Sequence, residues 1–464
     1  MTNLEDIVSL CKRRGFIYPS SEVYGGFSSS YDFGPLGTEL ENNIKGVWWS
    51  EMTKIHDNIV GLDSAILMSP KIWEASGHVA KFSDLMTECE KCKKRFKVDN
   101  LIEELVKSEK SLLLSTDIKK VNEKLKETKC PLCGGKLAEA RPFNLMFKTH
   151  VSAVEKKESE VYLRPETCQG IYVNFKNVID SMRAKIPFGI AQIGKAFRNE
   201  INPKDFLFRV REFEQMEMQW FCNSKDANKY FEYWKEERIK WYLNLGIKKE
   251  NLRAREIPEK ERAHYAKRQI DLEYKYPFGW DEIEGIHNRG DWDLSTHSKH
   301  SGKDLKYLDK QTNQKYIPNI IETSVGVGRL FLAFLSEAYQ EVKGGRTETT
   351  KSTKEQELVL KLDKRLSPVK VAVFPLIKKD KKLVKLAKNV FKDLKKEFVS
   401  QYDEVDSVGR RYRRQDEIGT PYCVTIDFDS LNDKTVTIRD RDTMKQERVE
   451  IDELSNILED KLKA

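Results

Sequence analysis

The chain has 464 residues, of which 34% are charged, and its 82 basic and 74 acidic side chains give a net charge of +8. This length allows two or three domains without disulfide support, and the mild basic excess suits a protein that meets a polyanion without identifying one. No run is apolar enough to span a membrane and the N-terminus lacks an apolar signal core, so we expect a cytoplasmic protein with no membrane partner.

Residues 1–88 alternate helical and extended patterns. Apolar residues at helical spacing predict a short helix that ends at Gly15, and a longer helix begins after Pro35. The apolar stripe of the longer helix reaches Ile55, and an extended run that follows it stops at Pro70.

Two CxxC pairs bound residues 89–140 and account for four of the eight cysteines. Each pair can bring two thiolates to one ion, and four thiolates make a closed tetrahedral zinc site that is structural and not catalytic. The alternative is two unrelated reduced pairs. The CPLCGG form of the second pair favours a zinc-knuckle insertion, which holds a helical segment LIEELVKSEKSLLL and whose Zn²⁺ ligands are Cys89, Cys92, Cys130 and Cys133.

Strand-like runs dominate from about 161 to 222, and residues 225–270 have the pattern of a charged helical excursion exposed to solvent. Within the strand-like part, residues 197–200 and 209–217 predict a β-hairpin. Alternate residues of its return strand share one face, and they are Arg209, Arg211, Phe213, Gln215 and Glu217. A row of guanidinium, ring and carboxylate groups makes a poor core but can hold an adenine and a charged substrate. An exposed face with cross-strand ion pairs is the commoner alternative.

Further along, short strands carry acids in pairs. Glu282 and Glu284 are expected on one strand face, as are Glu322 and Ser324 on another. Paired acids can hold Mg²⁺ together with the phosphates of a nucleotide, although solvated acids are more common. Gly326 to Arg329 then opens an apolar helix whose N-terminus could attract an anion.

The composition changes near the C-terminal end. Residues 341–366 are polar and turn-rich, which predicts a linker. Residues 367–464 combine a buried-type strand, a Lys-rich amphipathic helix and alternating segments, which predicts a small α/β domain.

The order of these features resembles the three signature motifs of class II aminoacyl-tRNA synthetases. The helix and strand that end at Pro70 are similar to motif 1, and Gly326, Gly328 and Arg329 to motif 3. Motif 2 corresponds to FRNE at 197–200 followed by Arg209, Phe213 and Glu217. Within the class, YDFGPLGTEL, YLRPETCQG and GRRYRRQDEIGTPY are similar to the homodimeric, single-polypeptide glycyl-tRNA synthetases.

This resemblance implies an α+β fold. An antiparallel β-sheet catalytic core flanked by helices is expected over 1–88 and 141–340, with the zinc-knuckle insertion at 89–140, a helical insertion near 225–270, a linker at 341–366 and an anticodon-binding domain at 367–464. It also implies that glycine is activated with ATP and Mg²⁺ to glycyl-adenylate and then transferred to the 3′ end of tRNA(Gly), by a homodimer.

The resemblance assigns roles to individual residues. Arg198, Glu200 and Arg329 are expected to be catalytic. The ATP site is expected to contain these three with Asn199, Phe208, Arg209, Phe213, Glu282, Glu284, Gly326 and Gly328. Glycine is expected to contact Glu166, Phe213, Gln215, Glu217, Arg289, Glu322 and Ser324, and at least one of the acids that surround its ammonium should have a raised pKa or a nearby cation. The tRNA anticodon is expected at Arg410, Arg411, Tyr412, Arg413 and Arg414.

Two alternatives remain beside the enzyme. A non-catalytic relative that binds tRNA should have lost Arg198, Glu200 or Arg329, but all three are present. A zinc-stabilised nucleic-acid-binding protein would have no use for paired acids in strands.

Overall fold

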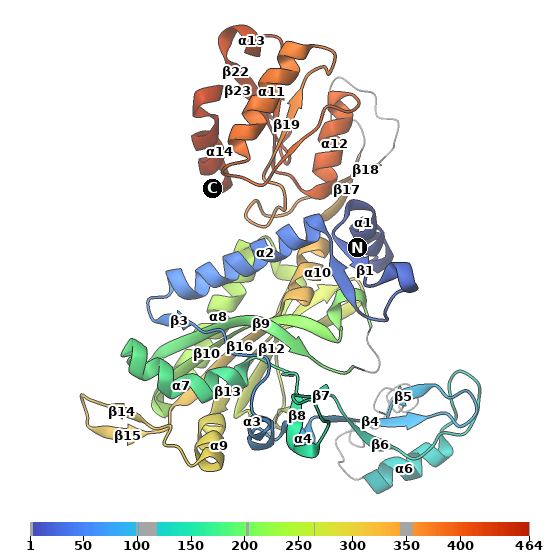
Figure 1. The fold of residues 1–464 in the computed structure, drawn as a ribbon, viewed down its shortest axis with the longest axis vertical. Coiled ribbons are helices and arrows are strands. Elements are labelled where there is room, and N and C mark those ends of the chain that lie inside the picture. Colours follow the sequence, from blue (N-terminus) through green and yellow to red (C-terminus); the bar gives the residue numbers. More distant parts are fainter. Residues whose placement is uncertain are drawn as a thin grey trace.

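A seven-stranded sheet forms the centre of the computed structural model, which describes residues 3–98, 101, 118–200, 204–263, 265–343 and 356–463 (Figure 1). Its neighbours pair antiparallel, except that the edge strand β3 runs parallel to β9. In spatial order the strands are β11 (Leu252–Glu256), β12 (Arg268–Tyr276), β13 (Gly279–Gly290), β16 (Asn319–Gly326), β10 (Glu212–Cys222), β9 (Phe188–Phe197) and β3 (Ile59–Gly61). The predicted α+β class with an antiparallel-rich core is confirmed.

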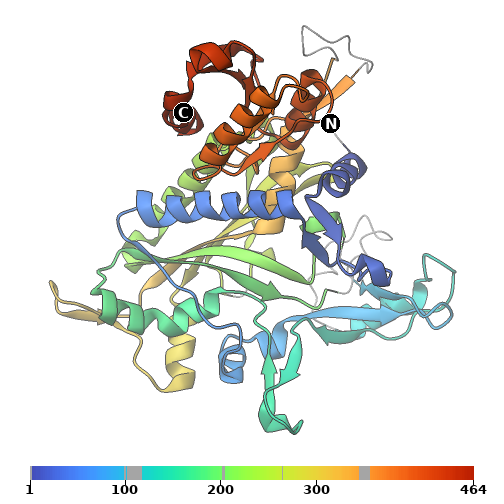
Figure 2. The ribbon, with the colours of Figure 1, turned by 45° about the horizontal axis from the view of Figure 1, so that its top comes forward.

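Helices cover both faces of this sheet (Figures 1 and 2). One face packs its apolar side chains, such as Met216 and Trp220, into the largest core with three helices: α2 (Pro35–Ser50), α8 (Ala227–Asn244) and α10 (Val327–Ala338). The opposite face packs against α7 (Cys168–Met182) and α9 (Trp292–Ser301) and carries the polar side chains of β10. Alternate side chains of β10 therefore point to an apolar face and to a more polar face of the sheet, and a binding site can form on the polar face.

Three expectations about these elements are wrong. The strand-like pattern over 161–222 contains α7, because its apolar residues recur at helical spacing and bury one face. The charged segment 225–270 is no solvated excursion, since Trp234 and Trp241 of α8 are buried against the sheet and the segment also contains β11 and the first residues of β12. The apolar stripe of α2 does not reach Ile55, which is exposed at the end of a π-helical turn, Glu51–Ile55.

The N-terminal segment packs beside α2 and α10. Helix α1 (Leu4–Arg14) ends at Gly15, whose φ of +75° is the left-handed conformation that favours glycine. A small hairpin of β1 (Ile17–Pro19) and β2 (Tyr31–Phe33) follows, with a 3₁₀ turn at Glu22–Tyr24 between its strands.

The cysteine-bounded insertion extends away from the body of the molecule (Figure 1). The short helices α3 (Pro70–Ala75) and α4 (His78–Lys81) lead into it. Its sheet has the order β5 (Arg95–Lys97), β4 (Ser83–Glu88), β6 (Arg141–Asn144), and α6 (Ile118–Glu127) packs nearby. The helix expected at LIEELVKSEKSLLL falls outside the described residues apart from Leu101. Two further hairpins are β7 (Lys148–His150) with β8 (Glu160–Tyr162) and β14 (Tyr307–Asp309) with β15 (Gln314–Tyr316), and the second lies on the opposite side of the molecule from the insertion (Figure 1).

The C-terminal residues build a second sheet with its own core. The linker expected over 341–366 is partly a hairpin, because β17 (Tyr339–Lys343) pairs with β18 (Gln356–Leu360). The second sheet has the order β20 (Ser400–Tyr402), β19 (Val371–Pro375), β21 (Tyr422–Ile426), β22 (Thr435–Asp440), β23 (Gln446–Glu450). Its helices are α11 (Lys381–Leu394), α12 (Val408–Ile418), α13 (Ser430–Asp433) and α14 (Leu454–Lys463). Across the described residues, no helix combines the length and apolar character needed to cross a membrane.

Candidate active site

A cavity of about 230 Å³ lies on the polar face of the central sheet. Three strands, β10, β13 and β16, supply its floor, and the connection between β9 and β10 supplies one wall. Of the residues expected to bind ATP or glycine, the cavity is lined by Glu166, Arg198, Glu200, Phe208, Arg209, Phe213, Gln215, Glu217, Glu282, Glu322, Ser324, Gly326, Gly328 and Arg329. The segments that resemble motifs 2 and 3 therefore meet in one hollow.

Glu217 lies at the centre of an acidic group with Glu166 and Glu322. Its Oε2 accepts a hydrogen bond from the Thr167 hydroxyl at 2.6 Å, and its Oε1 accepts one from the Ser324 hydroxyl at 2.8 Å. Burial, and then the charges of Glu322 and Glu166, raise the pKa of Glu217 to about 8. This carboxyl group therefore keeps its proton at neutral pH unless a cation enters the cavity.

Glu322 has a cation of its own. The Arg289 guanidinium donates to Glu322 Oε2 at 2.6 Å and makes two further hydrogen bonds to Asp293, at 2.7 and 2.8 Å. The ring of Tyr265 covers this guanidinium, with its centroid 3.7 Å from Cζ. Arg289 does not line the cavity, so it acts from behind the acid that it orients.

Glu166 is held mainly through one oxygen. Its Oε1 lies 3.0 Å from the Cys168 thiol, 2.9 Å from the Gln169 amide nitrogen and 3.3 Å from His78 Nε2. The electrostatic repulsion among the three acids is thus reduced in three different ways. Glu217 carries a proton, Arg289 lies beside Glu322, and His78 lies beside Glu166.

Arginines and rings occupy the other end of the cavity. Arg198 lies over the Phe213 ring, 5.4 Å from its centroid, and its Nε donates to the carbonyl of Pro165 at 3.0 Å. Arg329 lies over the Phe208 ring at 4.3 Å. Two guanidinium groups beside aromatic faces suit a planar base with a phosphate chain.

Glu282 faces the cavity and pairs with Arg329 Nη1 at 3.2 Å. Burial of Glu282 opposes its ionisation, but Arg329 outweighs this effect and lowers the pKa of the carboxyl group. Glu282 therefore carries a negative charge at neutral pH.

The expectation that Glu284 shares this face is wrong. Glu284 is fully buried on the opposite face, where Arg238 Nε donates to it at 2.8 Å and the Tyr242 hydroxyl at 2.6 Å. The cause is a β-bulge: Leu272 pairs with Glu284 while the next residue, Glu273, pairs with Glu282. The extra residue in β13 breaks the period of two and turns the two acids to opposite sides of the sheet. Glu284 is a structural ion-pair partner of α8 and lies outside the cavity.

Two other expected residues also stay outside. The backbone N–H of Asn199 donates to the Leu145 carbonyl at 2.7 Å, and Asn199 is not part of the cavity lining. Arg211 was expected on the same strand face as Phe213 and Glu217. However, β10 begins only at Glu212, and Arg211 donates hydrogen bonds to the carbonyls of Glu200 and Ser28.

Gly328 marks a place where the backbone must approach closely. A Cβ built there would lie 2.8 Å from the carbonyl oxygen of Leu207, so any side chain would displace the wall of the cavity. The glycine of the third motif is therefore a packing requirement between α10 and the connection that carries Phe208.

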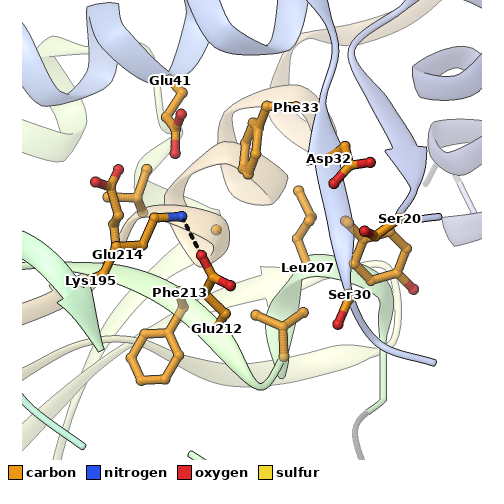
Figure 3. Close-up of a pocket in the computed structure, with 14 residues that line it drawn as sticks. Ser20, Ser30, Asp32, Phe33, Glu41, Lys195, Leu207, Glu212, Phe213 and Glu214 are labelled. Carbon is orange, nitrogen blue, oxygen red and sulfur yellow. Dashed lines mark ion pairs between the residues drawn. The ribbon is translucent and has the colours of Figure 1, made fainter. Parts of the chain in front are cut away.

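A second cavity of about 370 Å³ lies on the other side of Phe213, beneath α2 (Figure 3). Glu41 reaches into it from α2, and Glu212 and Glu214 from β10, opposite the N-terminal hairpin (Figure 3). Lys195 pairs with Glu212 at 3.1 Å. Since acids outnumber bases in this lining, the cavity would repel a triphosphate, and the arginine-lined cavity is the better nucleotide site.

The four cysteines of the CxxC pairs come together. Their sulfur atoms all lie within 4.8 Å of one another, and the distances from Cys89 to Cys133 and from Cys92 to Cys130 are 3.5 and 3.7 Å. A tetrahedral zinc with bonds of about 2.3 Å needs sulfur atoms about 3.8 Å apart, so the cluster fits such an ion.

The basic run of the C-terminal domain is not an exposed loop. Residues 410–414 belong to α12, so successive side chains point in different directions around the helix. Arg411 is only 2% exposed and bonds backbone carbonyls including that of Pro375, and the buried Tyr412 hydroxyl bonds Thr425. Arg413 pairs with Glu357, and Arg414 with Asp403 and Asp406. The prediction that these residues present charge and stacking to RNA is wrong for Arg411 and Tyr412. Among the five, Arg410 is the most exposed, with 65% of its side chain accessible, and its Nη1 lies 3.4 Å from Asp406.

Some cavity residues were not anticipated from the sequence. Tyr265 and His287 line the acidic end, and His78 supports Glu166 from α4. Tyr265 lies in the segment that was expected to be exposed to solvent. The sequence would place His287 on the cavity face of its strand only if the β-bulge in β13 were already known. Nothing in the sequence around His78 indicates its partner.

Two family models match the chain. Residues 147–338 match the tRNA synthetase class II core domain (G, H, P, S and T), and residues 370–461 match the anticodon binding domain. Proteins similar along the whole chain include three named glycine–tRNA ligase. The one from Caldanaerobacter subterraneus subsp. tengcongensis is 53% identical, over 99% of this chain and 98% of its own. Those from Treponema denticola and Clostridium acetobutylicum are 49% and 50% identical, over 99% of this chain and 97% and 99% of theirs.

Proposed function

The chain belongs to the glycine–tRNA ligases of the class II synthetases, and we propose that it activates glycine with ATP to glycyl-adenylate and then transfers glycine to the 3′ end of tRNA(Gly). The observation that carries the proposal is the shared cavity. Three glutamates at one end can grip an ammonium, and arginines with aromatic rings at the other can hold a nucleotide.

Arg198 is the residue that neutralises charge in the first step. The glycine carboxylate attacks the α-phosphate of ATP, so negative charge gathers between the two substrates. Within the described residues only Nε of Arg198 makes a hydrogen bond, and its two Nη groups remain for the carboxylate and the phosphate. A planar fork can bridge two anions, which a lysine ammonium does less well.

The nucleotide is held by residues around the Phe213 ring. Phe213 offers one stacking surface and Arg329 a cationic cover, while Glu200 can accept the amino group of adenine. Arg209 faces the β- and γ-phosphates. Glu282 is the acid that remains for Mg²⁺, which commonly uses one or two carboxylates together with phosphate oxygens and there offsets phosphate charge. Arg329 must then move from its pairing with Glu282 to the base.

Glycine is recognised through its nitrogen. Glu166, Glu217 and Glu322 surround the position of the ammonium, and Gln215 Oε1, which is buried without a hydrogen-bond partner among the described residues, is a further acceptor. A larger amino acid is excluded by the walls, so no editing site is required.

The tRNA contact in the C-terminal domain is better supported on α11 than on α12. Lysines three or four residues apart form one exposed face, and within the described residues only Lys388 has an acid within 4 Å, Glu404 at 3.9 Å. Unpaired like charges repel, and a phosphate backbone relieves that repulsion. This face, with Arg410, is the proposed contact, and its lysines are Lys378, Lys381, Lys385, Lys388 and Lys392.

Three further features belong to the proposal. Zinc in the four-cysteine cluster stabilises the insertion. A homodimer would cover exposed apolar side chains of the N-terminal segment, where Val23 and Tyr24 are each 90% exposed. The reaction belongs in the cytoplasm, where ATP and tRNA meet.

The reaction is tested by amino-acid-dependent exchange between ATP and pyrophosphate. Purified protein should catalyse exchange with glycine and not with alanine or serine, and Arg198→Ala should abolish it without unfolding the protein. Equal exchange with the three amino acids, or none with glycine, would contradict the assignment.

The tRNA surface is tested separately. Lys385→Ala with Lys392→Ala should raise KM for tRNA and reduce the salt dependence of binding by about 1.5 to 2 in log–log slope. Exchange without tRNA should stay unchanged. A control of equal charge outside α11, Lys445→Ala with Lys463→Ala, should leave both parameters near wild type, and an equal effect of the two pairs would contradict the α11 face.

A further inference from the structure

His78 is fixed beside the glycine pocket by contacts on every side. It opens α4, just before the cysteine insertion, and its Nδ1 lies 2.8 Å from the hydroxyl of Ser76. The rings of Trp73 and Phe82 pack around the imidazole, with centroids 5.5 and 5.2 Å away. The ring therefore has one orientation, in which Nε2 points at Glu166.

The contacts of Glu166 are unequal at its two oxygens. Oε1 receives His78 Nε2, the Cys168 thiol and the Gln169 amide, and Gln169 is itself fixed by His297 at 2.8 Å. Within the described residues Oε2 has no hydrogen-bond partner. One oxygen is thus saturated by the protein while the other remains for a ligand in the cavity.

The hydrogen bonds of His78 agree with a donor at Nε2. When the Ser76 hydroxyl donates to Nδ1, the neutral imidazole carries its hydrogen on Nε2 and donates it to Glu166. When the imidazole is protonated both nitrogens donate, and Ser76 can pass its own hydrogen to the Trp73 carbonyl, 3.4 Å away. In either state His78 supplies a hydrogen bond to the carboxylate.

His78 is also the side chain best placed to favour the charged form of Glu166. Among the groups that face this acid, Glu217 and Glu322 disfavour its charge, and Arg289 is already bonded to Glu322 and Asp293. Burial would raise the pKa of Glu166, but His78, followed by Arg289 and the Cys168 thiol, holds it well below its usual range. Without His78, Arg289 would be the strongest remaining charge that favours ionised Glu166.

We propose that His78 is a positioning residue for glycine: it anchors Oε1 of Glu166 as a carboxylate so that Oε2 meets the ammonium of the substrate. This inference rests on the proposed function, because it requires glycine in this cavity. It assigns to α4 a part in amino-acid recognition, although His78 does not itself line the cavity.

The test compares two substitutions of this histidine in the full-length protein. His78→Phe keeps an aromatic ring between Trp73 and Phe82 but removes the donor. It should raise KM for glycine in the exchange reaction by about 10- to 100-fold, the effect of losing a hydrogen bond to a charged group, with KM for ATP and kcat within about twofold. His78→Gln retains an N–H donor and should recover most of the affinity. At low pH the fall of kcat/KM for glycine should become steeper in His78→Phe than the one-proton slope set by Glu217, because Glu166 then takes up a proton more readily.

A matched control and distinct outcomes keep the test decisive. His56 is a similarly half-buried histidine, 3.9 Å from Glu51 and outside the cavity, so His56→Phe should leave KM for glycine unchanged. An unchanged KM for glycine in His78→Phe would overturn the inference. Equal increases in KM for glycine and for ATP that His78→Gln does not reverse would also overturn it. Absence of glycine-dependent exchange by the wild type would instead contradict the proposed function.

Discussion

Glycine binding should be linked to release of a proton from Glu217. This carboxyl group has a pKa of about 8 because it is buried beside Glu166 and Glu322. Glycine brings an ammonium into the group of three acids, and a carboxylate binds it better than a carboxylic acid does. The perturbation is therefore pH, and the expected response is a KM for glycine that falls as pH rises.

The magnitude follows from the titration of one group. With a pKa of about 8, roughly 1% of Glu217 is ionised at pH 6 and roughly 10% at pH 7. If the ionised form binds glycine, KM should fall about tenfold between pH 6 and 7 and level off above pH 8. At pH 7 glycine binding should release about 0.9 proton per site, since that fraction of the group is protonated beforehand.

Two measurements check this expectation. KM for glycine in ATP–pyrophosphate exchange gives the slope, and calorimetric titration of glycine in buffers of different ionisation enthalpy gives the protons released. Glu217→Gln supplies the comparison: it should bind glycine weakly, and its KM should lose the steep change between pH 6 and 7. A flat KM in the wild type, or the same slope in Glu217→Gln, would refute the reasoning.

Other predictions concern stability and the metal. Arg238→Ala should lower the free energy of unfolding by about 3 to 5 kcal/mol, because it leaves the buried carboxylate of Glu284 without its ion-pair partner, while the KM values of the folded enzyme change little. Denaturant titration and exchange kinetics would measure these two effects. A selective loss of Mg²⁺ dependence would contradict the structural role. Cys133→Ser should reduce bound zinc from about one per chain to near zero and make the insertion sensitive to proteases, as metal analysis and limited proteolysis would report; a wild-type protein without zinc but with a protected insertion would refute that role. Arg411→Ala should destabilise the C-terminal domain by about 2 kcal/mol or more through unpaired buried carbonyls, whereas Arg410→Ala should be nearly neutral in thermal unfolding; equal effects would contradict the assignment of Arg411 to the interior.

The sequence was sufficient where a simple period holds. Alternation in β10 separates Gln215 and Glu217 from Met216 and Met218, and the helix after Gly326 and the cap at Gly15 follow from local rules. These features depend on neighbours in the chain, so pattern and propensity are enough to place them.

The sequence did not predict the structure correctly where the alternation of a strand is interrupted or where the secondary structure of a segment was assigned wrongly. The bulge in β13 is a tertiary feature of pairing with β12, and it moved Glu284 from the expected site to an ion pair with α8. The five consecutive residues of the basic run in α12 were all expected to contact the anticodon, although no helix was predicted there. In a helix they spread around the axis, and Arg411 and Tyr412 face inward.

The acidic pocket shows why specificity for the smallest amino acid needs several kinds of support. Three carboxylates close enough to share one ammonium would destabilise the empty protein if all were ionised and unpaired. Here Arg289 pairs with Glu322, His78 Nε2 lies 3.3 Å from Glu166, and Glu217 keeps a proton that can leave. In the proposed complex, only the proton of Glu217 departs when glycine binds. The ammonium therefore takes the place of that proton, and the two other acids remain held in position by the groups behind them.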